Sequence, residues 1–326
     1  MKILVTGAAG FIGAAVSRRL LAEGNEVVGL DNLNPYYDVR LKEARLGTLA
    51  GYDGFRFVKT DLADAESLNR LFEENHFECV VNLAAQAGVR YSIENPRAYI
   101  DSNLTGFFNI LECCRNHPVQ HLVYASSSSV YGANEKVPFS EEDKVDDPVS
   151  LYAATKKADE LMASCYSKLY GIPATGLRFF TVYGPWGRPD MAPLLFTKAI
   201  DEGRPIKVFN EGNMSRDFTY IDDIVEGVVR VISLAPSLRP DRGRHDIFNI
   251  GCSSPVKLTD FISALEEALG KKAIKVMTPM QKGDVVYTYA DTAKLEKAVG
   301  YKPCVTVRDG VARLVEWYLL SGKDLL

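Results

Sequence analysis

The first thirteen residues restrict the fold of this chain more than any other stretch does. An apolar run at residues 3–5 leads into a turn with Gly7, Gly10 and Gly13, and residues 14–23 then have helical periodicity. Glycines let backbone amides approach a pyrophosphate, and the N-terminus of the following helix adds unpaired N–H groups and a partial positive charge. A strand, a glycine turn and a helix in this order predict a dinucleotide-binding unit, with Phe11 and Ile12 inside the turn.

The end of the second predicted strand indicates which dinucleotide binds. Residues 26–30 form an apolar run that ends at Asp31, eighteen residues after Gly13, where a carboxylate accepts hydrogen bonds from an adenosine ribose. The next residues, Asn32 and Leu33, are not basic, whereas an arginine there would have met a 2'-phosphate. The sequence therefore predicts NAD rather than NADP.

Strand and helix patterns alternate through the first half of the chain. Further strands are predicted at residues 55–58, 79–83 and 121–124, with helices around 67–74 and 103–115. This alternation is typical of an α/β fold with a Rossmann-like, doubly wound parallel sheet. Ligands of such sheets bind beyond the carboxyl ends of the strands. Those ends carry Gly7, Asp31, Asp61 and the segments 84–87 and 126–129.

Composition excludes several classes of function. A chain of 326 residues with 47% hydrophobic residues can bury a large core, and its net charge of −4 provides no basic face for nucleic acid. No run of eighteen apolar residues predicts a membrane span, and the first residues leave no room for a signal peptide. The six cysteines form no C-x-x-C pair and the four histidines no ligand pattern, so we expect a cytoplasmic protein without a metal site.

Tyr152 and Lys156 are the candidate catalytic pair. Their spacing places phenol and ammonium on one face of a predicted helix. A free phenol has a pKa near 10 and is a poor base at neutral pH, unless a nearby cation stabilises the phenolate. Taken alone, Tyr-x-x-x-Lys also occurs as an ordinary pair on a helix surface.

Several motifs together show a family resemblance. The glycine turn at 6–13, Asp31, Asp61-Leu62, residues 83–85, the serine run 127–132, the Tyr152–Lys156 pair and residues 216–218 resemble an extended short-chain dehydrogenase/reductase over nearly the full length. Within that family, residues 177–191 resemble the nucleotide-sugar 4-epimerases that act on UDP-glucuronate.

The resemblance implies roles for individual residues. Tyr152 and Lys156 are catalytic with Ser127, although Ser126, Ser128 and Ser129 leave the register of the serine open. The cofactor ligands that it implies are Gly7, Gly10, Phe11, Ile12, Gly13, Asp31, Asn32, Asp61, Leu62, Leu83, Ala84, Ala85, Tyr152 and Lys156. The substrate ligands are Ser127, Ser128, Arg90, Thr181, Arg188 and Arg216. The resemblance also predicts a homodimer, in which the helices near 103–115 and 152–170 pair across a two-fold axis.

The same resemblance implies a reaction without net redox change. Tyr152 removes the O4 proton of a UDP-sugar while the C4 hydride passes to NAD, and return of the hydride to the opposite face inverts C4. Relatives that dehydrate or decarboxylate carry a carboxylate where Ser128 and Ser129 stand. A UDP-glucuronate decarboxylase and a UDP-glucose or UDP-GlcNAc 4-epimerase are the alternatives within the family. The alternative outside catalysis is an NAD-binding regulatory protein.

The second half of the chain is predicted to bind the sugar nucleotide. We expect an NAD-binding domain at residues 1–180, to which 219–252 return, and a smaller α/β substrate domain at 181–326. Arg216 is the candidate ligand of the diphosphate, because a guanidinium suits phosphate oxygens; the alternative is an ion pair with Asp217 or Asp222. Arg188 is the candidate ligand of a sugar carboxylate, and a surface pair with Asp190 is the alternative. Galactose-type epimerases carry Arg where Gln281 stands, and Lys282 is a possible substitute.

Overall fold

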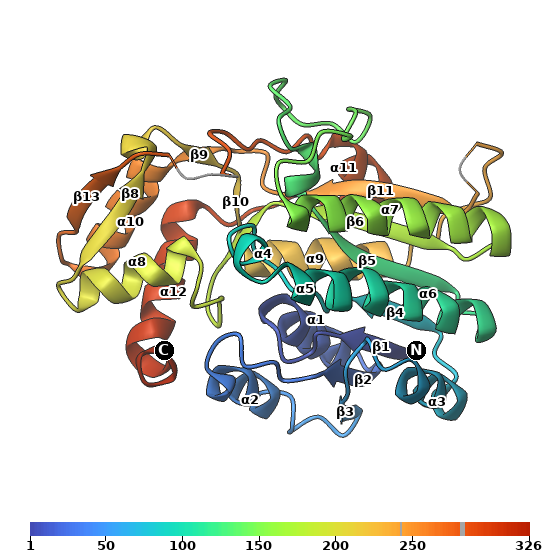
Figure 1. Cartoon of the computed structure of the whole chain (residues 1–326). Helices are drawn as coiled ribbons and strands as arrows, with labels where there is room; N and C mark the ends of the chain where they lie inside the picture. Colours follow the sequence, from blue (N-terminus) through green and yellow to red (C-terminus); the bar gives the residue numbers. More distant parts are fainter. Residues whose placement is uncertain (242, 281–283) are drawn as a thin grey trace.

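The computed structural model describes residues 1–241, 243–280 and 284–326 (Figure 1). Its largest sheet has seven strands in the order β11-β6-β5-β4-β1-β2-β3, and every neighbouring pair is parallel. The strands are β1 Lys2–Thr6, β2 Glu26–Asp31, β3 Phe55–Lys59, β4 Cys79–Asn82, β5 His121–Ser127, β6 Ala174–Phe179 and β11 His245–Ile250. The prediction of an α/β fold with a doubly wound parallel sheet is confirmed.

Helices cover both faces of this sheet, because side chains along each strand alternate between two apolar cores. Ile3 and Val5 belong to one core, and Leu4, between them, belongs to the other. The first core holds side chains of α1 (Phe11–Ala22) and α9 (Ile221–Ile232). The second holds side chains of α3 (Ala65–Asn75), α6 (Gly106–Asn116) and α7 (Leu151–Tyr170).

The smaller part of the molecule lies beside the carboxyl ends of the large sheet (Figure 1). It contains α8 (Ala192–Asp201), α10 (Leu258–Leu269), α12 (Val307–Trp317) and the parallel pair β8 (Pro205–Phe209) and β13 (Ile274–Thr278). Two short strand pairs, β7 (Thr181–Tyr183) with β10 (Phe218–Tyr220) and β9 (Ser215–Arg216) with β12 (Val256–Lys257), join it to the large sheet. The remaining helices are α2 Val39–Gly47, α4 Tyr91–Glu94, α5 Pro96–Tyr99 and α11 Ala293–Val299, with π-helical turns at Ile100–Thr105 and Tyr318–Gly322 and 3-10 turns at Ser128–Tyr131, Asn210–Gly212 and Lys323–Leu325.

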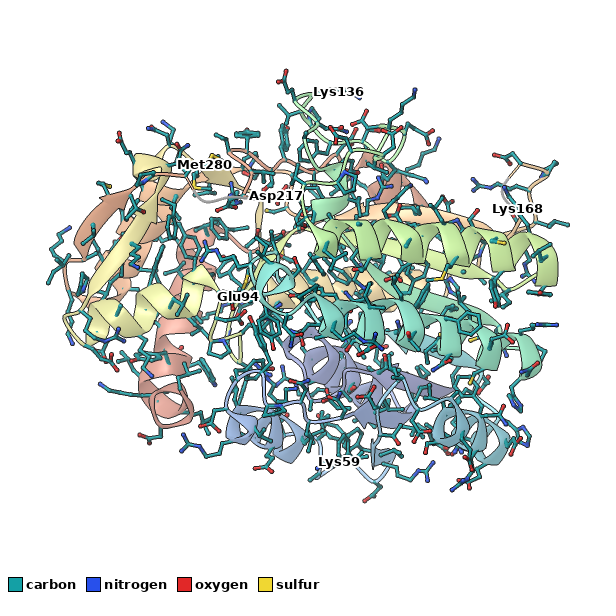
Figure 2. The ribbon with its side chains drawn as sticks, viewed as in Figure 1. Lys59, Glu94, Lys136, Lys168, Asp217 and Met280 are labelled. Carbon is teal, nitrogen blue, oxygen red and sulfur yellow. The ribbon has the colours of Figure 1, made fainter. Side chains whose placement is uncertain are left out.

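Asp217 ties the two parts together near the middle of the molecule (Figure 2). Its fully buried carboxylate accepts hydrogen bonds from the backbone amides of Cys252 (2.7 Å), Ser253 (3.0 Å) and Ala290 (3.0 Å). Burial raises the pKa of Asp217, and these amides oppose the shift. The carboxylate therefore fixes the strand that carries Arg216.

Several predicted elements agree closely with the structure. The strands predicted at 55–58, 79–83 and 121–124 correspond to β3, β4 and β5, and the helix predicted around 67–74 lies within α3. The helix predicted at 103–115 begins instead as a π-helical turn and continues as α6. Helix α2 is not apparent from the sequence, because its exposed face is strongly charged and it has no apolar stripe. Among the described residues, no helix is long and apolar enough to span a membrane. The domain boundaries stay a prediction.

Candidate active site

One cavity of about 990 Å³ runs along the carboxyl ends of the central strands and into the smaller part of the molecule. This volume lies at the upper end of the range for ligand pockets, as two extended ligands require. All of the predicted site residues line it: Gly7, Gly10, Phe11, Ile12, Gly13, Asp31, Asn32, Asp61, Leu62, Leu83, Ala84, Ala85, Arg90, Ser127, Ser128, Tyr152, Lys156, Thr181, Arg188 and Arg216. Their individual roles stay predictions.

The glycine turn at the start of α1 presents backbone to the cavity. Gly7 has φ of +69°, and a Cβ there would lie 2.9 Å from the amide nitrogen of Ala84. A Cβ on Gly13 would lie 2.0 Å from the carbonyl oxygen of Gly7. Gly10 begins the helix without a side-chain cap, and the first turn of α1 holds no acidic residue. The turn therefore offers free N–H groups to an anion and fits the diphosphate of a dinucleotide.

Asp31 is fixed at the end of β2. Its Oδ2 accepts from the amide of Ala9 (3.2 Å) and its Oδ1 from the amide of Leu33 (2.8 Å). Lys42 of α2 places its ammonium 3.7 Å from Oδ1, and burial lowers the pKa of Lys42. The carboxylate thus lines the cavity in one orientation, as a ribose ligand should. Lys42 is not apparent as a site residue from the sequence, because α2 has no apolar periodicity.

Tyr152 and Lys156 lie in the first turns of α7. The hydroxyl of Ser150 caps this helix by accepting from the amide of Ala153 at 3.1 Å. Lys156 is 3% exposed, and its ammonium donates to the carbonyl of Ala125 at 3.0 Å. Both side chains line the cavity, so the predicted helix and its reactive face are present.

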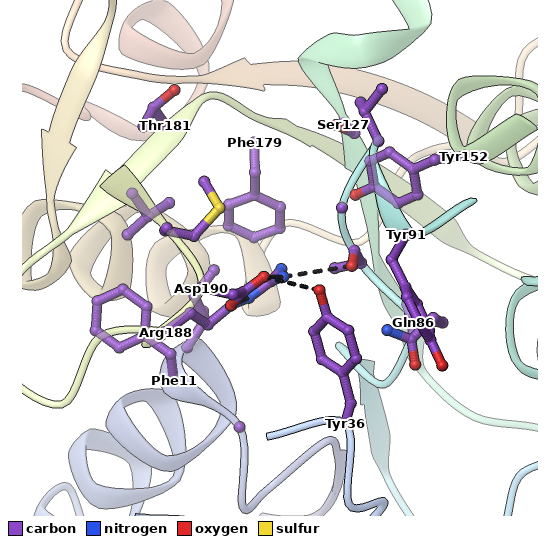
Figure 3. A pocket seen from close by; sticks show the side chains of 18 of the residues that line it. Phe11, Tyr36, Gln86, Tyr91, Ser127, Tyr152, Phe179, Thr181, Arg188 and Asp190 are labelled. Atoms are coloured by element: carbon purple, nitrogen blue, oxygen red, sulfur yellow. Dashed lines mark hydrogen bonds and ion pairs between the residues drawn. The ribbon is translucent and has the colours of Figure 1, made fainter. Parts of the chain in front are cut away.

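The structure distinguishes the serines that follow β5. Ser126 is buried and donates its hydroxyl to Glu160 at 2.7 Å. Ser127 lies next to Tyr152 in the cavity wall (Figure 3), and its Oγ accepts from the amide of Ser129 at 3.2 Å. This geometry favours Ser127 over Ser126 as the hydroxyl that faces a substrate.

A row of tyrosines extends from Tyr152; Tyr152, Tyr91 and Tyr36 line the cavity, and the fully buried Tyr99 packs behind its wall. The ring centroids of Tyr152 and Tyr99 are 6.0 Å apart, those of Tyr99 and Tyr91 6.2 Å, and those of Tyr91 and Tyr36 4.5 Å. The hydroxyl of Tyr36 donates to Asp190 at 3.1 Å. Burial, followed by the charge of Asp190, raises the pKa of Tyr36 to about 12, so this phenol stays a donor.

Arg188 is held by Asp190, but the pair lies in the cavity wall rather than in bulk solvent (Figure 3). Its Nε and Nη2 donate to the two carboxylate oxygens at 3.1 and 2.6 Å, and Nη2 also donates to the carbonyl of Ala87 at 3.3 Å. The side chain of Arg188 is 21% exposed. Within the described chain these contacts leave Nη1 for a ligand. The alternative, a pair with Asp190, is therefore present, but in the cavity wall rather than at the surface, and the role of Arg188 as a substrate ligand stays a prediction.

Arg216 pairs with neither predicted alternative, Asp217 nor Asp222. Its guanidinium contacts Asp284 at 3.0 Å, and Arg90 lies 4.0 Å from the other oxygen of the same carboxylate. A pocket wall that collects two guanidinium groups suits an anion such as a diphosphate. The predictions for Gln281 and Lys282 lie outside the described residues.

Arg45 of α2, which the sequence pattern does not reveal either, links the glycine turn to the loop before Arg188. Its guanidinium is 1% exposed and donates to the carbonyls of Ala9 (3.1 Å), Trp186 (2.7 Å) and Gly187 (2.8 Å). Tyr37 accepts a further bond at 2.7 Å. The glycine turn and the loop that carries Arg188 are therefore held by one buried side chain.

Fold and site together define a dinucleotide-binding α/β protein with a tyrosine–lysine pair beside the cofactor position. The chain belongs to the NAD dependent epimerase/dehydratase family, which matches residues 3–251, and its cofactor is NAD. This bears out the predicted family and cofactor.

Individual proteins are similar over nearly the whole chain. An uncharacterised 37.6 kDa protein of Escherichia coli O111:H- is 60% identical over 98% of both chains. A probable UDP-glucuronate 4-epimerase of Rhizobium meliloti is 52% identical over 98% of this chain and 97% of the relative. The crystal structure of UDP-glucuronic acid 4-epimerase from Bacillus cereus, in complex with UDP-glucuronic acid and NAD, matches with a TM-score of 0.90 and 34% identity, and the match covers 100% of each chain.

Proposed function

We propose that this protein is a nucleotide-sugar 4-epimerase that converts UDP-glucuronate to UDP-galacturonate. The observation that carries the proposal is the position of Arg188, which lines the same cavity as Tyr152 and Lys156 and retains donor capacity for a carboxylate. The names of the similar proteins from Rhizobium meliloti and Bacillus cereus support the same substrate.

In the proposed reaction the chain's own residues handle the proton and the orientation of the sugar. NAD, when bound, supplies the chemistry of taking up a hydride from C4 and giving it back. Tyr152 accepts the O4 proton and later returns it, while the hydroxyl of Ser127 donates a hydrogen bond to the oxygen as carbonyl character develops. Lys156 stabilises the phenolate form of Tyr152 by its charge.

Inversion requires that the sugar turn over between the two hydride transfers. Arg216 and Arg90 are proposed to hold the diphosphate, so that the keto sugar rotates about its link to an anchored group. Arg188, with Thr181, then receives the carboxylate. Neither the cofactor nor Tyr152 undergoes net change, so no second substrate is needed.

The acidic residues of the cavity argue against dehydratase and decarboxylase chemistry. Each route needs an additional acid or base near the sugar. Among the described residues, the lining carboxylates are Asp31, Asp61, Asp190 and Asp284. Each has partners: Asp31 and Asp61 accept from neighbouring amides, Asp190 binds Arg188, and Asp284 binds Arg216. Ser128 and Ser129, which line the same cavity as Tyr152, offer only hydroxyl groups.

Proton NMR of products from UDP-glucuronate, UDP-glucose and UDP-GlcNAc tests the proposal. The coupling of the sugar H4 reports inversion directly, and we expect UDP-galacturonate from the first substrate. Formation of UDP-pentose as the main product assigns a decarboxylase, and preference for UDP-glucose assigns the other epimerase. A protein that binds NAD but shows neither product nor reduced nicotinamide absorbance is the regulatory alternative.

A further inference from the structure

A second buried carboxylate lies beside the catalytic lysine. Asp159, one turn along α7, accepts a hydrogen bond from the ammonium of Lys156 at 3.1 Å, and the two side chains are 2% and 3% exposed. Its other oxygen, Oδ1, is buried and meets no hydrogen-bond donor among the described residues. The proposed reaction assigns no role to this group.

The neighbouring charges leave Lys156 as the cation that balances Asp159. Glu160, the next residue, is bound on both oxygens by Arg178 of β6 at 2.8 and 2.9 Å, and it also contacts Lys157 at 3.3 Å. Tyr124 of β5 faces the same region. Burial raises its pKa well above the ordinary value, with the charges of Glu160 and Asp159 adding to the shift, so this phenol stays neutral.

We propose that Asp159 is a positioning residue that fixes the ammonium of Lys156 and offsets part of its charge at Tyr152. This inference rests on the acid/base role of Tyr152 in the proposed function. An epimerase must both remove and return the O4 proton, so its acid/base group works best when neither form is strongly favoured. Lys156 and the positive nicotinamide both favour the phenolate form of Tyr152. A carboxylate next to the lysine reduces this preference, so that the phenol and phenolate forms are closer in free energy.

The ionisation of Asp159 fits this role. Burial raises the pKa of Asp159 to about 7, although the charge of Lys156 opposes the shift. The carboxylate is therefore charged above about pH 7 and loses its charge as the pH falls. Its effect on Lys156 is greatest at neutral and basic pH.

The test is Asp159→Asn, which keeps the size of the side chain and an acceptor for Lys156 but removes the charge. Tyr152 and Asp159 are two helical turns apart, about 10 Å, so the acid limb of the kcat–pH profile should move lower by about one unit where it lies above pH 7, and by less where Asp159 is already protonated. Lys156→Met should move it in the opposite direction. Asp222→Asn is the matched control, because Asp222 is 60% exposed and pairs with Arg313 at 3.8 Å outside the cavity; it should leave the profile unchanged.

A spectroscopic measurement separates this proposal from the proposed function. The tyrosinate difference absorbance of the NAD-bound enzyme, corrected with Tyr152→Phe, reports ionisation of Tyr152 without any sugar. We expect the same downward move in Asp159→Asn. An unchanged titration in a folded Asp159→Asn protein overturns the role of Asp159, even if UDP-glucuronate is epimerised; a shifted titration in a protein that does not turn over this sugar overturns only the proposed function.

If Asp159→Asn does not fold, the proposal can be tested by carboxyl NMR of the wild type and of Lys156→Met, each labelled with carbon-13 aspartate. In Lys156→Met the carboxylate of Asp159 loses its cation, so one aspartate resonance should titrate at higher pH than in the wild type. Identical aspartate titrations in the two proteins overturn the proposal.

Discussion

Arg188→Ala tests the proposed recognition of the sugar carboxylate most directly. In the structure Asp190 occupies Nε and Nη2 of the guanidinium, so a substrate carboxylate is expected at the Nη1 side. Hydrogen bonds to charged groups contribute about 1.5–3 kcal/mol each. Loss of such binding, about 3 kcal/mol in total, lowers kcat/KM for UDP-glucuronate on the order of 100-fold.

The expected effect on UDP-glucose is much smaller, because this sugar has no carboxylate. Arg188→Ala leaves Asp190 without its arginine, but Asp190 is 28% exposed and still accepts from Tyr36. Partly exposed ion pairs contribute about 0–1 kcal/mol, so residual UDP-glucose turnover should fall less than about fivefold. A 4-keto uronic acid is also a β-keto acid. Without Arg188 to hold its carboxylate, a larger share of the product should be decarboxylated UDP-pentose.

Kinetics on both sugars, with NMR of the products, measure these effects. Arg97→Ala is the matched control, because Arg97 also pairs with a nearby aspartate, Asp101, but is 81% exposed and does not line the cavity. Asp190→Asn is a second variant that frees the guanidinium and removes a repulsive charge, so it should lower KM for UDP-glucuronate. An equal loss on both sugars in Arg188→Ala, with no UDP-pentose, refutes the reasoning.

Three further outcomes are expected. Tyr152→Phe should abolish turnover but retain NAD and UDP-sugar binding by calorimetry, because it deletes one hydroxyl and keeps the ring; near-wild-type turnover contradicts the acid/base role. Two apolar side chains, Phe108 of α6 and Leu161 of α7, are 43% and 60% exposed and fit the predicted homodimer. Light scattering should therefore show that Leu161→Asp converts a dimer to a monomer, and a wild-type protein that is monomeric at micromolar concentration rules the dimer out. Burial lowers the pKa of His121 to about 4, so the free energy of unfolding should decrease by about 3 kcal/mol as the pH falls from above 6.5 to 4. The melting temperature of His121→Asn should therefore depend less on pH over that range, and an equal pH dependence in the two proteins refutes this.

The sheet and one side of the site could be predicted because strand ends have fixed places in a doubly wound fold. Gly7, Asp31 and Asp61 each follow a short apolar run, and parallel strands bring such positions to a single edge. Helical spacing placed Tyr152 and Lys156 on one face of a helix, and the family resemblance assigned that face to the site. These inferences need only local patterns and the topology of the fold.

The contacts that hold the site could not be predicted in this way. Residues 39–47 read as a charged segment without an apolar stripe, yet Lys42 and Arg45 are buried there. Their long side chains satisfy carbonyl and carboxylate groups of distant loops, and periodicity does not encode such contacts. The location of the Arg188–Asp190 pair also depends on packing. An arginine and an aspartate two positions apart in the sequence can form the same ion pair at a surface or in a cavity wall.

Arg45 shows why these contacts matter for the chemistry. One guanidinium binds the carbonyl of Ala9 in the glycine turn and those of Trp186 and Gly187 in the loop before Arg188. Moving either loop alone breaks hydrogen bonds of a buried charge, which costs more than breaking exposed ones. The glycine turn and Arg188, which is proposed to bind the sugar carboxylate, are therefore held in a fixed relative position. In the proposed reaction a hydride leaves one sugar carbon and returns to it, so the loops that hold the cofactor and the sugar must keep a constant separation, and Arg45 links them.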